Sequence, residues 1–490
     1  IGEKRINNKS VGNRIAAGLV GVSLGHPGLV RFGLAGWALT LETWFLADGC
    51  TPESPGYALM ALGGIYAFPQ ALRDYSDPPG YVDEDGKRID GLDLYGGQYK
   101  RIWQRMFEGL QGNLCYPPYA DTRRTAQIGA RFAELLAANY PDNLQYLALL
   151  KAHAGEDLAN GDHEAALFFR EPGLEHKGAP SLHFEDDLFP VLCLGQLRTG
   201  ERGERSLVLL SATHWGGHHH RDSLNLYYWK DGQELLTDLG YLWDHPDSGM
   251  TRRGFAHNTG MVDLKEQKTE GRGGYFHLFH TGDRVKVMEA SSRAYDGAGI
   301  YRRTVVQVDH GAGDSYVLDI FRLQADGARQ LVYHGPNSDY AVAGIDLHEG
   351  ATTCSELDLE NTKSACSPGT WSVEWRMADD VRFSAFHCGQ QAEMVTIGDG
   401  WGQRDHLNTD LGVALPYIVR SHKPEAGIST FCTVYEAHRP NAGLVKSVSR
   451  LTGPECGADT TVALEIETSS GVDLVISQFV PMEVEVEASV

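Results

Sequence analysis

The sequence has 490 residues, of which 42% are hydrophobic and 10% aromatic, a composition typical of a soluble globular protein. A chain of this length is too long to fold around a single hydrophobic core, so we expect roughly two to four domains. The formal net charge of −22 argues against nucleic acid as a partner, because no basic stripe is present to displace counterions. No apolar run approaches the roughly 18–20 residues needed to cross a bilayer, which argues against a membrane span. An acidic substrate stays compatible with this charge, because a local arginine cluster can bind anions in an acidic protein.

The cysteines and the start of the chain carry two further expectations. The eight cysteines form no CxxC pair, so the spacing of a zinc finger is absent. For Cys354 and Cys366, a disulfide and buried free thiols both stay open. The chain begins at Ile1 inside a polar motif, without a charged and then apolar leader. We therefore expect that an N-terminal portion precedes Ile1.

The first third of the chain has the periodicity of helices. Apolar residues recur there at spacings of three and four, which predicts amphipathic helices. Ser54 precedes Pro55, which predicts an N-cap followed by proline at the first helical position. Consecutive helices of this kind suggest an α/α bundle or toroid. The expected helices are 11–24, 28–46, 55–72, 97–111, 121–139 and 142–153.

From about Phe184 the pattern changes to short alternating runs typical of β-strands. Turn signals such as KDG at 230–232 separate these runs at the spacing of a large antiparallel sandwich. We therefore expect an α+β multidomain chain. Its parts are a helical (α/α) toroid portion over 1–180 and an antiparallel β-sandwich over 181–490. We also expect a small C-terminal β-subdomain from about residue 390.

Histidines and carboxylates gather between residues 218 and 257. Alternate residues of a strand face the same way, so His218, His220 and Asp222 would share one face. A hairpin across the KDG turn would bring Asp238 back to His220, and His257 follows in the next loop. Two imidazoles and a carboxylate form a donor set that zinc accepts. The alternative is a solvated His–Asp pair beside an accidental histidine run, with Asp222 orienting a histidine or bonding local backbone.

The order of these motifs resembles the heparinase II/III-like family of polysaccharide lyases. The matching features are H-x-H-x-D at 218–222, D-x-G at 238–240, and HN at 257–258 before a short strand and Gln267. The segment YRRTVVQVDHGAGDSYVLDIFRL at 301–323 is also similar to the family's next hairpin pair. The resemblance implies an (α/α) toroid followed by an antiparallel β-sandwich. It also implies cleavage of uronic-acid polysaccharides by β-elimination.

The resemblance assigns roles within the histidine-rich stretch. It implies that His220, Asp238 and His257 bind one structural zinc ion, and that no organic cofactor is needed. His218, two residues before the first ligand, matches the family's catalytic histidine. Tyr241, shortly after Asp238, would line the substrate-binding site.

The resemblance extends to the helical part. The segment LADGCTPESPGYALMAL is similar to the family's DG…E-x-x-x-Y helix start, which implies Tyr57 as the catalytic tyrosine with Glu53 nearby. A core aromatic is the alternative for Tyr57. The opening RINNKSVGNR resembles the family's NNH or NH segment, which implies that Asn8 neutralises the substrate carboxylate, with Asn7 as its neighbour. Lys9 stands where the family often has histidine, so either Lys9 or Asn8 alone would supply this role. A capping or turn role for the asparagine pair is the alternative.

β-Elimination removes the C5 proton of a uronate and expels the C4 oxygen, so a base and a stabilised enolate-like charge are needed. Tyr57 or His218 is the base, depending on whether the proton and the leaving group are syn or anti. Arginines of the helical part favour a glycosaminoglycan substrate, with alginate as the alternative. A zinc hydrolase and a non-catalytic carbohydrate-binding protein are the rivals from other classes. The arginines of the helical part that favour a glycosaminoglycan are Arg73, Arg101, Arg105, Arg123 and Arg124.

The resemblance also implies secretion or a periplasmic location.

Overall fold

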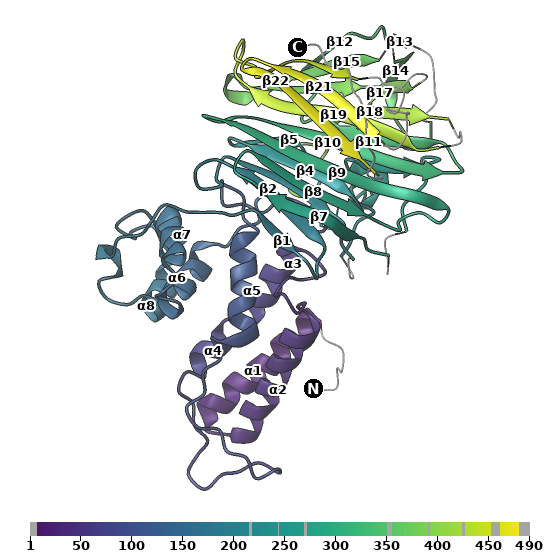
Figure 1. Cartoon of the computed structure of the whole chain (residues 1–490). Coiled ribbons are helices and arrows are strands. Elements are labelled where there is room, and N and C mark those ends of the chain that lie inside the picture. Colours follow the sequence, from purple (N-terminus) through teal and green to yellow (C-terminus); the bar gives the residue numbers. More distant parts are fainter. Residues whose placement is uncertain are drawn as a thin grey trace. The chain divides into compact units, whose positions relative to one another are not determined.

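The chain divides into two compact units. The computed structural model describes residues 7–214, 218–243, 245–268, 272–349, 355–367, 369–389, 393–423, 427–451 and 461–479. The helical unit comprises Ile1–Leu110, Leu114–Pro117 and Asp121–Phe184. The sheet unit comprises Gln111–Asn113, Pro118–Ala120 and Glu185–Val490. Figure 1 shows the helices of the first unit in purple and blue and the strands of the second in teal to yellow.

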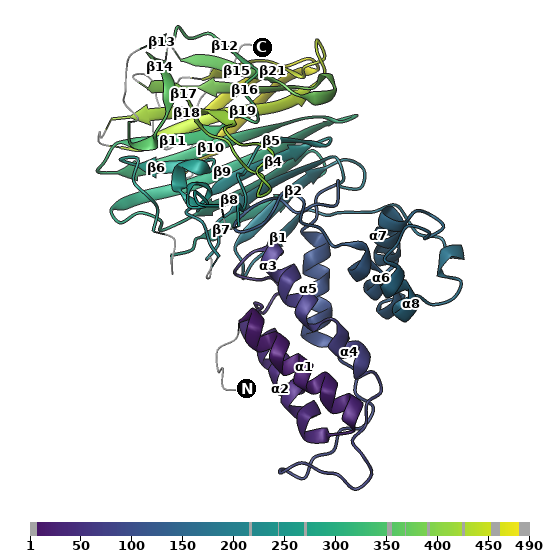
Figure 2. The same ribbon diagram turned by 180° about the vertical axis from the view of Figure 1, so that it is seen from behind.

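The helical unit is built from neighbouring helices that pack in pairs. Helix α1 packs on α2, and α6 packs on α7 and α8, as Figures 1 and 2 show from opposite sides. Within the described residues, no helix combines the length and the apolarity required to cross a membrane. Helix pairs are the repeating element of an (α/α) toroid, and the toroid itself stays a prediction. The helices are α1 (Asn8–Leu24), α2 (Pro27–Thr43), α3 (Pro55–Ile65), α4 (Ala67–Ala71), α5 (Gly97–Glu108), α6 (Ala130–Asn139), α7 (Leu144–Ala154) and α8 (His163–Phe169).

One predicted helix is shorter than the periodicity suggested. We expected a helix over 121–139, but α6 begins only at Ala130. The segment before α6 folds back on the residues just ahead of it, because Cys115 forms an isolated antiparallel bridge with Gln127. The Tyr116 amide also donates to the Ala126 carbonyl at 2.8 Å. These pairings hold the segment before α6 in a non-helical conformation.

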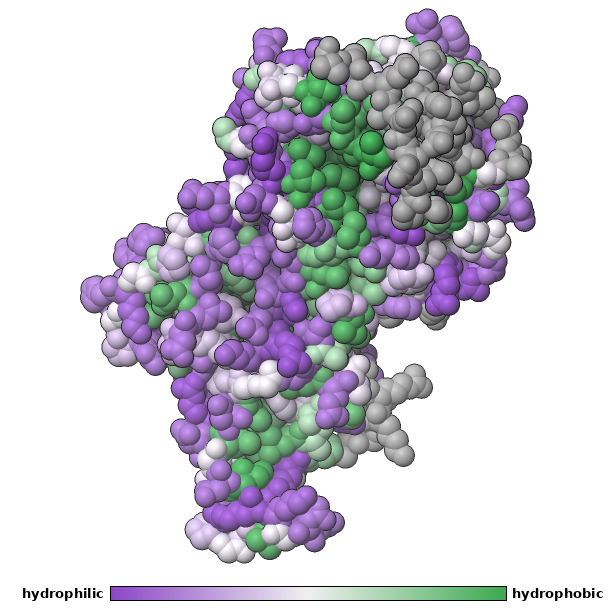
Figure 3. Space-filling view, in the orientation of Figure 1, coloured by the Kyte–Doolittle hydropathy of each residue, from purple (hydrophilic) through white to green (hydrophobic). Residues whose placement is uncertain are grey.

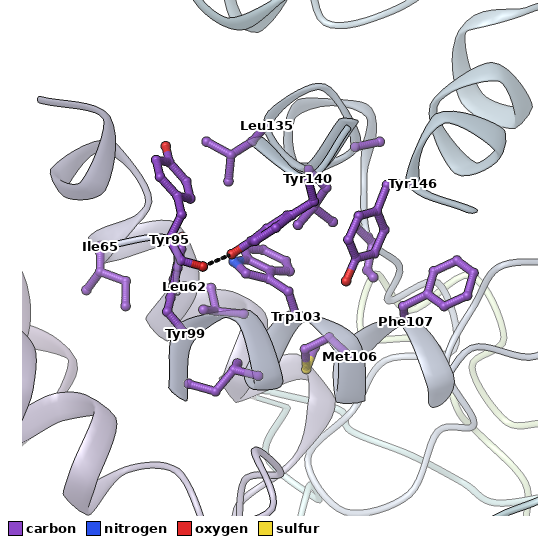
Figure 4. Packing of buried hydrophobic residues seen from close by; sticks show 14 of the residues in the cluster. Leu62, Ile65, Tyr95, Tyr99, Trp103, Met106, Phe107, Leu135, Tyr140 and Tyr146 are labelled. Atoms are coloured by element: carbon purple, nitrogen blue, oxygen red, sulfur yellow. Dashed lines mark hydrogen bonds between the residues drawn. The ribbon is translucent and has the colours of Figure 1, made fainter. Parts of the chain in front are cut away.

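Several aromatic side chains meet in the core of the helical unit, as Figure 4 shows. The rings of Tyr99 and Trp103 meet edge to face with centroids 6.1 Å apart. The Tyr140 hydroxyl donates to the Tyr95 carbonyl at 2.8 Å, which satisfies a polar atom inside this apolar cluster. Large rings therefore link α5 to α6 and α7 in one core.

The described strands of the sheet unit form four antiparallel sheets. A five-stranded sheet has the order β1-β2-β3-β4-β5, an eight-stranded sheet the order β12-β15-β16-β19-β10-β9-β8-β7, and a six-stranded sheet the order β13-β14-β17-β18-β11-β6. A three-stranded sheet has the order β20-β21-β22. The strands are β1 (Asp187–Phe189), β2 (Leu194–Thr199), β3 (Ser206–Ser211), β4 (Asn225–Lys230), β5 (Gln233–Leu236), β6 (Thr259–Val262), β7 (Tyr275–Thr281), β8 (Val285–Ser291), β9 (Ala298–Gly311), β10 (Asp314–Ala325), β11 (Arg329–His334), β12 (Tyr340–Ala343), β13 (His348–Glu349), β14 (Glu360–Cys366), β15 (Thr370–Arg376), β16 (Arg382–Cys388), β17 (Met394–Trp401), β18 (Ala414–His422), β19 (Ser429–His438), β20 (Val445–Arg450), β21 (Thr461–Thr468) and β22 (Gly471–Gln478).

The structure corrects the expected start of the small C-terminal β-subdomain, which we had placed at about residue 390. Strands β17 and β18 belong to the six-stranded sheet, and β19 lies in the middle of the eight-stranded sheet beside β10. These strands pair with partners far away in the sequence, so residues 394–438 are part of the large sheets. The separate small sheet begins only at Val445.

The large sheets pack face to face through shared apolar side chains. One core cluster draws from the five-, eight- and six-stranded sheets, with members such as Leu210, Phe321 and Ile418. A second cluster joins the small sheet to the eight-stranded sheet, through Leu464 on β21 and Leu318 on β10. The outer face of β22 exposes Val472, Leu474 and Ile476. Figure 3 shows a band of apolar residues on the visible face of this unit, among mostly hydrophilic surface.

Candidate functional site

The hairpin of β4 and β5 positions the histidine-rich stretch. Its turn contains Asp231 and Gly232, both with positive φ (47° and 87°), and it joins the directly paired Lys230 and Gln233. Two successive residues with positive φ are the requirement of a type I′ turn, which Asp-Gly satisfies with little strain. The hairpin predicted from the KDG signal is therefore confirmed. It aligns the start of β4 with the residues that follow β5.

His220, Asp238 and His257 come together as predicted. Their ligand atoms all lie within 4.8 Å of one another, and the three residues are at most 1% exposed. The Asp238 Oδ2 lies 3.0 Å from His257 Nδ1. The Asp238 Oδ1 accepts the Gly240 amide at 2.9 Å, and the imidazole centroids of His220 and His257 are 5.4 Å apart.

Burial and charge act against each other at these groups. Burial alone would raise the pKa of Asp238, but the charge and hydrogen bond of His257 hold it below its usual value. Burial would lower the pKa of His257, and Asp238 raises it above its usual value instead. Asp222 is fully buried beside them, and burial raises its pKa despite the opposing influence of the two histidines. Two carboxylates buried so close together cost free energy that a cation would offset.

The residues present fit a metal ion. The Nε2 atom of His257 is buried and has no hydrogen-bond partner in the described structure, although its Nδ1 atom is engaged. An orphaned buried nitrogen beside a carboxylate and a second imidazole is the arrangement of a ligand set for a borderline cation such as zinc. Metal ligands as buried as these are typical of a structural site, because a catalytic metal ion needs an open position that the substrate can reach.

Two residues that sequence reasoning missed hold this cluster in place. Asn225 donates from Nδ2 to Asp238 Oδ2 at 2.9 Å, and its Oδ1 accepts the Asn258 amide at 2.9 Å. Arg303 donates from Nη1 to the Leu224 carbonyl at 2.7 Å and forms a two-bond ion pair with Asp319. The position of Asn225 at the start of the hairpin could have indicated that it contacts the metal-binding candidates. No local sequence pattern indicated this for Arg303.

Gln267 ties the entrance of the hairpin to the large sheets. Its Oε1 accepts the Ser223 amide at 2.8 Å, and its Nε2 donates to the Tyr301 hydroxyl at 2.8 Å.

The strand expected to begin at His218 was wrong. Residues 218–222 lie in a turn and loop, and β4 begins only at Asn225. Backbone contacts of this loop, such as that of Ser223, therefore replace strand pairing in placing His220.

The other predicted site residues of this unit, His218 and Tyr241, lie close in sequence to the metal-binding candidates. His218 lies in the turn before His220 and is half-buried, and Tyr241 is half-buried in the loop after Asp238. Residues 215–217, the start of the motif, lie outside the described residues. The catalytic role of His218 and the substrate contact of Tyr241 stay predictions.

Tyr57 lies in the first turn of α3, at a firmly fixed helix start. The Ser54 Oγ accepts the Tyr57 amide at 3.1 Å, which confirms the predicted N-cap. Ser54 Oγ also donates to the Asp121 carbonyl at 3.0 Å and is fully buried. Tyr57 itself is half-buried, as is Glu53, whose amide donates to the Thr51 hydroxyl. The helix start is therefore rigid, and the Tyr57 ring is partly accessible.

The asparagines at the N-terminus divide into two cases. Asn7 caps α1, because its Oδ1 accepts the Ser10 amide at 2.9 Å and the Ser10 hydroxyl accepts the Asn7 amide at 3.1 Å. The capping alternative is thus confirmed for Asn7, and its contact with substrate stays a prediction. Asn8 begins α1, but its side chain lies outside the described part. Lys9 is exposed.

Three of the five arginines that favoured a glycosaminoglycan substrate donate to groups of the chain itself. Arg101 donates to the Ala47 carbonyl at 2.8 Å, and Arg105 donates to the Asp48 carbonyl at 3.1 Å. Arg73 donates to Asn139. Their contacts weaken the argument that these side chains form an anion-binding cluster. Of the cysteines considered for a disulfide, Cys366 is an exposed free thiol, and Cys354 lies outside the described residues.

Comparison with known proteins gives one sequence relative and several structural ones. No family model matches the chain. An alginate lyase from Stenotrophomonas maltophilia is 23% identical over 96% of this chain and 65% of its own length. The chain thus spans about two thirds of the length of this curated relative.

Solved structures of similar fold include a heparinase III and a heparan sulfate lyase. A heparinase III structure has a TM-score of 0.71 at 12% identity, covering 97% of this chain and 68% of that one. A mutant heparan sulfate lyase from Pedobacter heparinus has a TM-score of 0.68 at 14% identity, covering 97% and 67%. At such low identity these matches establish the fold. The chain is thus similar in sequence to an alginate lyase and similar in fold to a heparinase III and a heparan sulfate lyase.

Proposed function

We propose that the chain is a polysaccharide lyase that cleaves a uronate-containing polymer by β-elimination. The single observation that carries this proposal is the meeting of His220, Asp238 and His257 in a chain with the fold of heparinase III. The alginate lyase similar to it in sequence supports the same reaction class. A polymer substrate also favours action outside the cytoplasm, and cell fractionation would test that location.

Two side chains are proposed to move the protons. One of Tyr57 and His218 removes the C5 proton of the uronate, and electrons of that bond form the C4=C5 double bond as the C4–O bond breaks. The leaving oxygen takes a proton, which a tyrosine hydroxyl is suited to supply. Asn8, with Asn7 and Lys9 beside it, is proposed to neutralise the substrate carboxylate and so stabilise the developing enolate-like charge. Glu53 and Tyr241 are proposed to contact the sugar.

We assign a structural zinc ion to His220, Asp238 and His257. When bound, zinc would cross-link the β4–β5 hairpin to the loop before β6 and thereby fix the backbone beside His218. The ligands are at most 1% exposed, which argues against the rival zinc hydrolase because a substrate could not reach the ion. Elemental analysis of the purified protein tests this assignment, with one zinc per chain expected.

For the substrate we favour an unsulfated, alginate-type polyuronate over a glycosaminoglycan. The sequence relative is an alginate lyase, and the helical-unit arginines Arg101 and Arg105 already donate to backbone carbonyls. Guanidinium groups engaged with the backbone are less suited to bind sulfate, which weakens the argument for a sulfated polymer. A glycosaminoglycan remains the second candidate because the solved structures of similar fold are named for heparan sulfate and heparin.

A panel of polymers tests the proposal. Alginate, heparan sulfate and chondroitin sulfate would each be incubated with the protein while the ultraviolet absorbance of the unsaturated product is followed. We expect a rise with alginate that a Tyr57→Phe variant does not give. Binding to a polymer without any rise would favour the rival carbohydrate-binding protein.

A further inference from the structure

Three polar side chains on one face of α5 bind three successive backbone carbonyls. Gln98 donates from Nε2 to the Leu46 carbonyl at 2.7 Å, and Arg101 donates from Nη1 to the Ala47 carbonyl at 2.8 Å. Arg105 donates from Nε to the Asp48 carbonyl at 3.1 Å. Their spacing of three and four residues places all of them on the same side of the helix. We call Gln98, Arg101 and Arg105 the α5 clamp.

The clamp holds the loop that leads to Tyr57. Residues 46–48 form the loop after α2, and the Leu46 carbonyl there also accepts the Gly49 amide at 2.9 Å. Gly49 has φ of +92°, and a Cβ atom there would lie 2.8 Å from the Arg101 carbonyl oxygen. The loop backbone therefore lies directly on α5. Bonds within the loop, such as that from the Leu46 amide to the Cys50 carbonyl at 2.7 Å, make it one rigid piece.

The other end of the same segment is fixed from a second direction. Ser54 donates to the Asp121 carbonyl at 3.0 Å, and the Gly56 amide donates to the Thr122 hydroxyl at 3.4 Å. A Cβ atom on Gly56 would lie 3.0 Å from the Asp121 carbonyl oxygen. The segment from Leu46 to Tyr57 is thus held at both ends by the body of the helical unit.

We propose that Gln98, Arg101 and Arg105 are positioning residues that set the place of the Tyr57 hydroxyl. This inference rests on the proposed function, in which Tyr57 transfers a proton. The clamp residues act on backbone carbonyls and leave the substrate to other groups. Glu108 orients one of them, because its carboxylate lies 2.7 Å from Arg105 Nη1. Loss of a clamp bond shifts the tyrosine relative to the sugar, and a misplacement of about 1 Å costs about a hundredfold in rate.

The test measures kcat and KM on polyuronate for variants of the clamp. Gln98→Ala and Arg105→Ala should each lower kcat by about ten- to a hundredfold with KM nearly unchanged. Arg105→Lys should recover part of the rate, because lysine retains a donor of similar reach. Gln104→Ala is the matched control, since Gln104 is exposed on the same helix, and it should keep the wild-type kcat and KM.

Gln98 separates positioning from direct substrate binding. A neutral side chain that gives the same kcat loss as Arg105 cannot act by attracting the anionic polymer. Thermal unfolding of each variant shows whether the fold is intact. Gln98→Ala removes two hydrogen bonds, the donation to the Leu46 carbonyl and the bond that Gln98 Oε1 accepts from Arg101 Nη1. A rise in KM at unchanged kcat for Arg105→Ala, with wild-type kcat for Gln98→Ala, would overturn the inference.

The controls keep this inference distinct from the proposed function. Wild-type cleavage that Tyr57→Phe abolishes, together with unchanged kcat in Gln98→Ala, would reject the clamp and leave the lyase assignment standing. A wild-type protein that cleaves no uronate polymer would reject the proposed function, and the positioning role would fall with it.

Discussion

The two units hold their candidate residues in opposite ways. In the sheet unit, His220, Asp238 and His257 are buried and bound to one another and to neighbouring side chains. In the helical unit, Tyr57 is half-buried, and the bonds that place it run through the backbone before and after it. The first arrangement makes the site part of the folding core. The second arrangement should allow the Tyr57 side chain to be substituted with little effect on the fold.

This difference predicts which substitutions should lower the stability of the protein and which should lower its activity alone. Removing a buried, bonded group leaves its partners unsatisfied, which costs free energy of unfolding. Removing the hydroxyl of the half-buried Tyr57 from a fixed helix start should cost little stability but would remove the proposed proton carrier. Substitutions in the two units should therefore fall into two distinct classes.

Tyr57→Phe is the sharpest test in the helical unit. We expect a loss of about a hundredfold to ten-thousandfold in kcat, because general acid–base catalysis contributes about that much. The melting temperature should stay within about 2 °C of wild type, since a change of a few tenths of a kcal/mol shifts it little. Steady-state kinetics and calorimetry measure the two quantities. Wild-type turnover in this variant would exclude Tyr57 as the proton carrier.

His220→Ala is the corresponding test in the sheet unit. We expect a loss of about 3–5 kcal/mol in the free energy of unfolding, because the buried carboxylates of Asp238 and Asp222 lose a compensating partner. Activity and bound zinc should fall together with stability. Urea unfolding and elemental analysis measure these effects. A stable variant with normal zinc content would show that His220 is no ligand.

Acid should weaken the sheet unit through Glu393, a second buried charge outside the site. Burial would raise the pKa of Glu393, but Arg420, at 2.7 Å from its carboxylate, and His422 hold it below the usual value. A depressed folded-state pKa contributes stability that is complete above the unfolded value of about 4.3 and is lost as the pH falls through the folded value. Unfolding free energies between about pH 6 and about pH 3 should therefore decline.

Glu393→Gln is the control for that decline. The variant should be less stable at about pH 6, because Arg420 is left buried without its partner, and it should lose less on acidification. Parallel pH profiles for the variant and the wild type would contradict the assignment of the acid effect to Glu393.

Asn7→Ala should give the smallest effect. Loss of the cap on α1 costs about 1 kcal/mol. Thermal unfolding measures this loss, and KM should change little if Asn7 acts only as a cap. An increase in KM without any loss of stability would instead indicate that Asn7 contacts the substrate.

Local patterns in the sequence were sufficient for the features that depend on neighbouring residues. The N-cap at Ser54 and the KDG hairpin follow from turn and cap chemistry, and both are confirmed. The convergence of His220, Asp238 and His257 followed from hairpin geometry together with the resemblance, and it is also confirmed. Each of these predictions needed contacts within about forty residues.

The helix expected over 121–139 lost its first half to pairing of Gln127 with Cys115, which the apolar spacing did not reveal although the two are near in sequence. Features that depend on distant partners could not be predicted either. The strands after residue 390 joined the large sheets because β19 pairs with β10, more than a hundred residues earlier. Arg101 and Arg105 suggested an anion site by residue type, but their partners are carbonyls of a loop more than fifty residues away.

The most direct test of the central claim is the mass of the products from alginate. Each cut by β-elimination gives one fragment whose new non-reducing end carries a C4=C5 double bond, lighter by one water than the corresponding product of hydrolysis, while the fragment that keeps the polymer's original non-reducing end stays saturated. We expect the purified wild-type chain to yield unsaturated fragments from every internal cut by mass spectrometry, and Tyr57→Phe to yield almost none. Internal fragments that are all saturated would contradict the lyase assignment and favour a hydrolase.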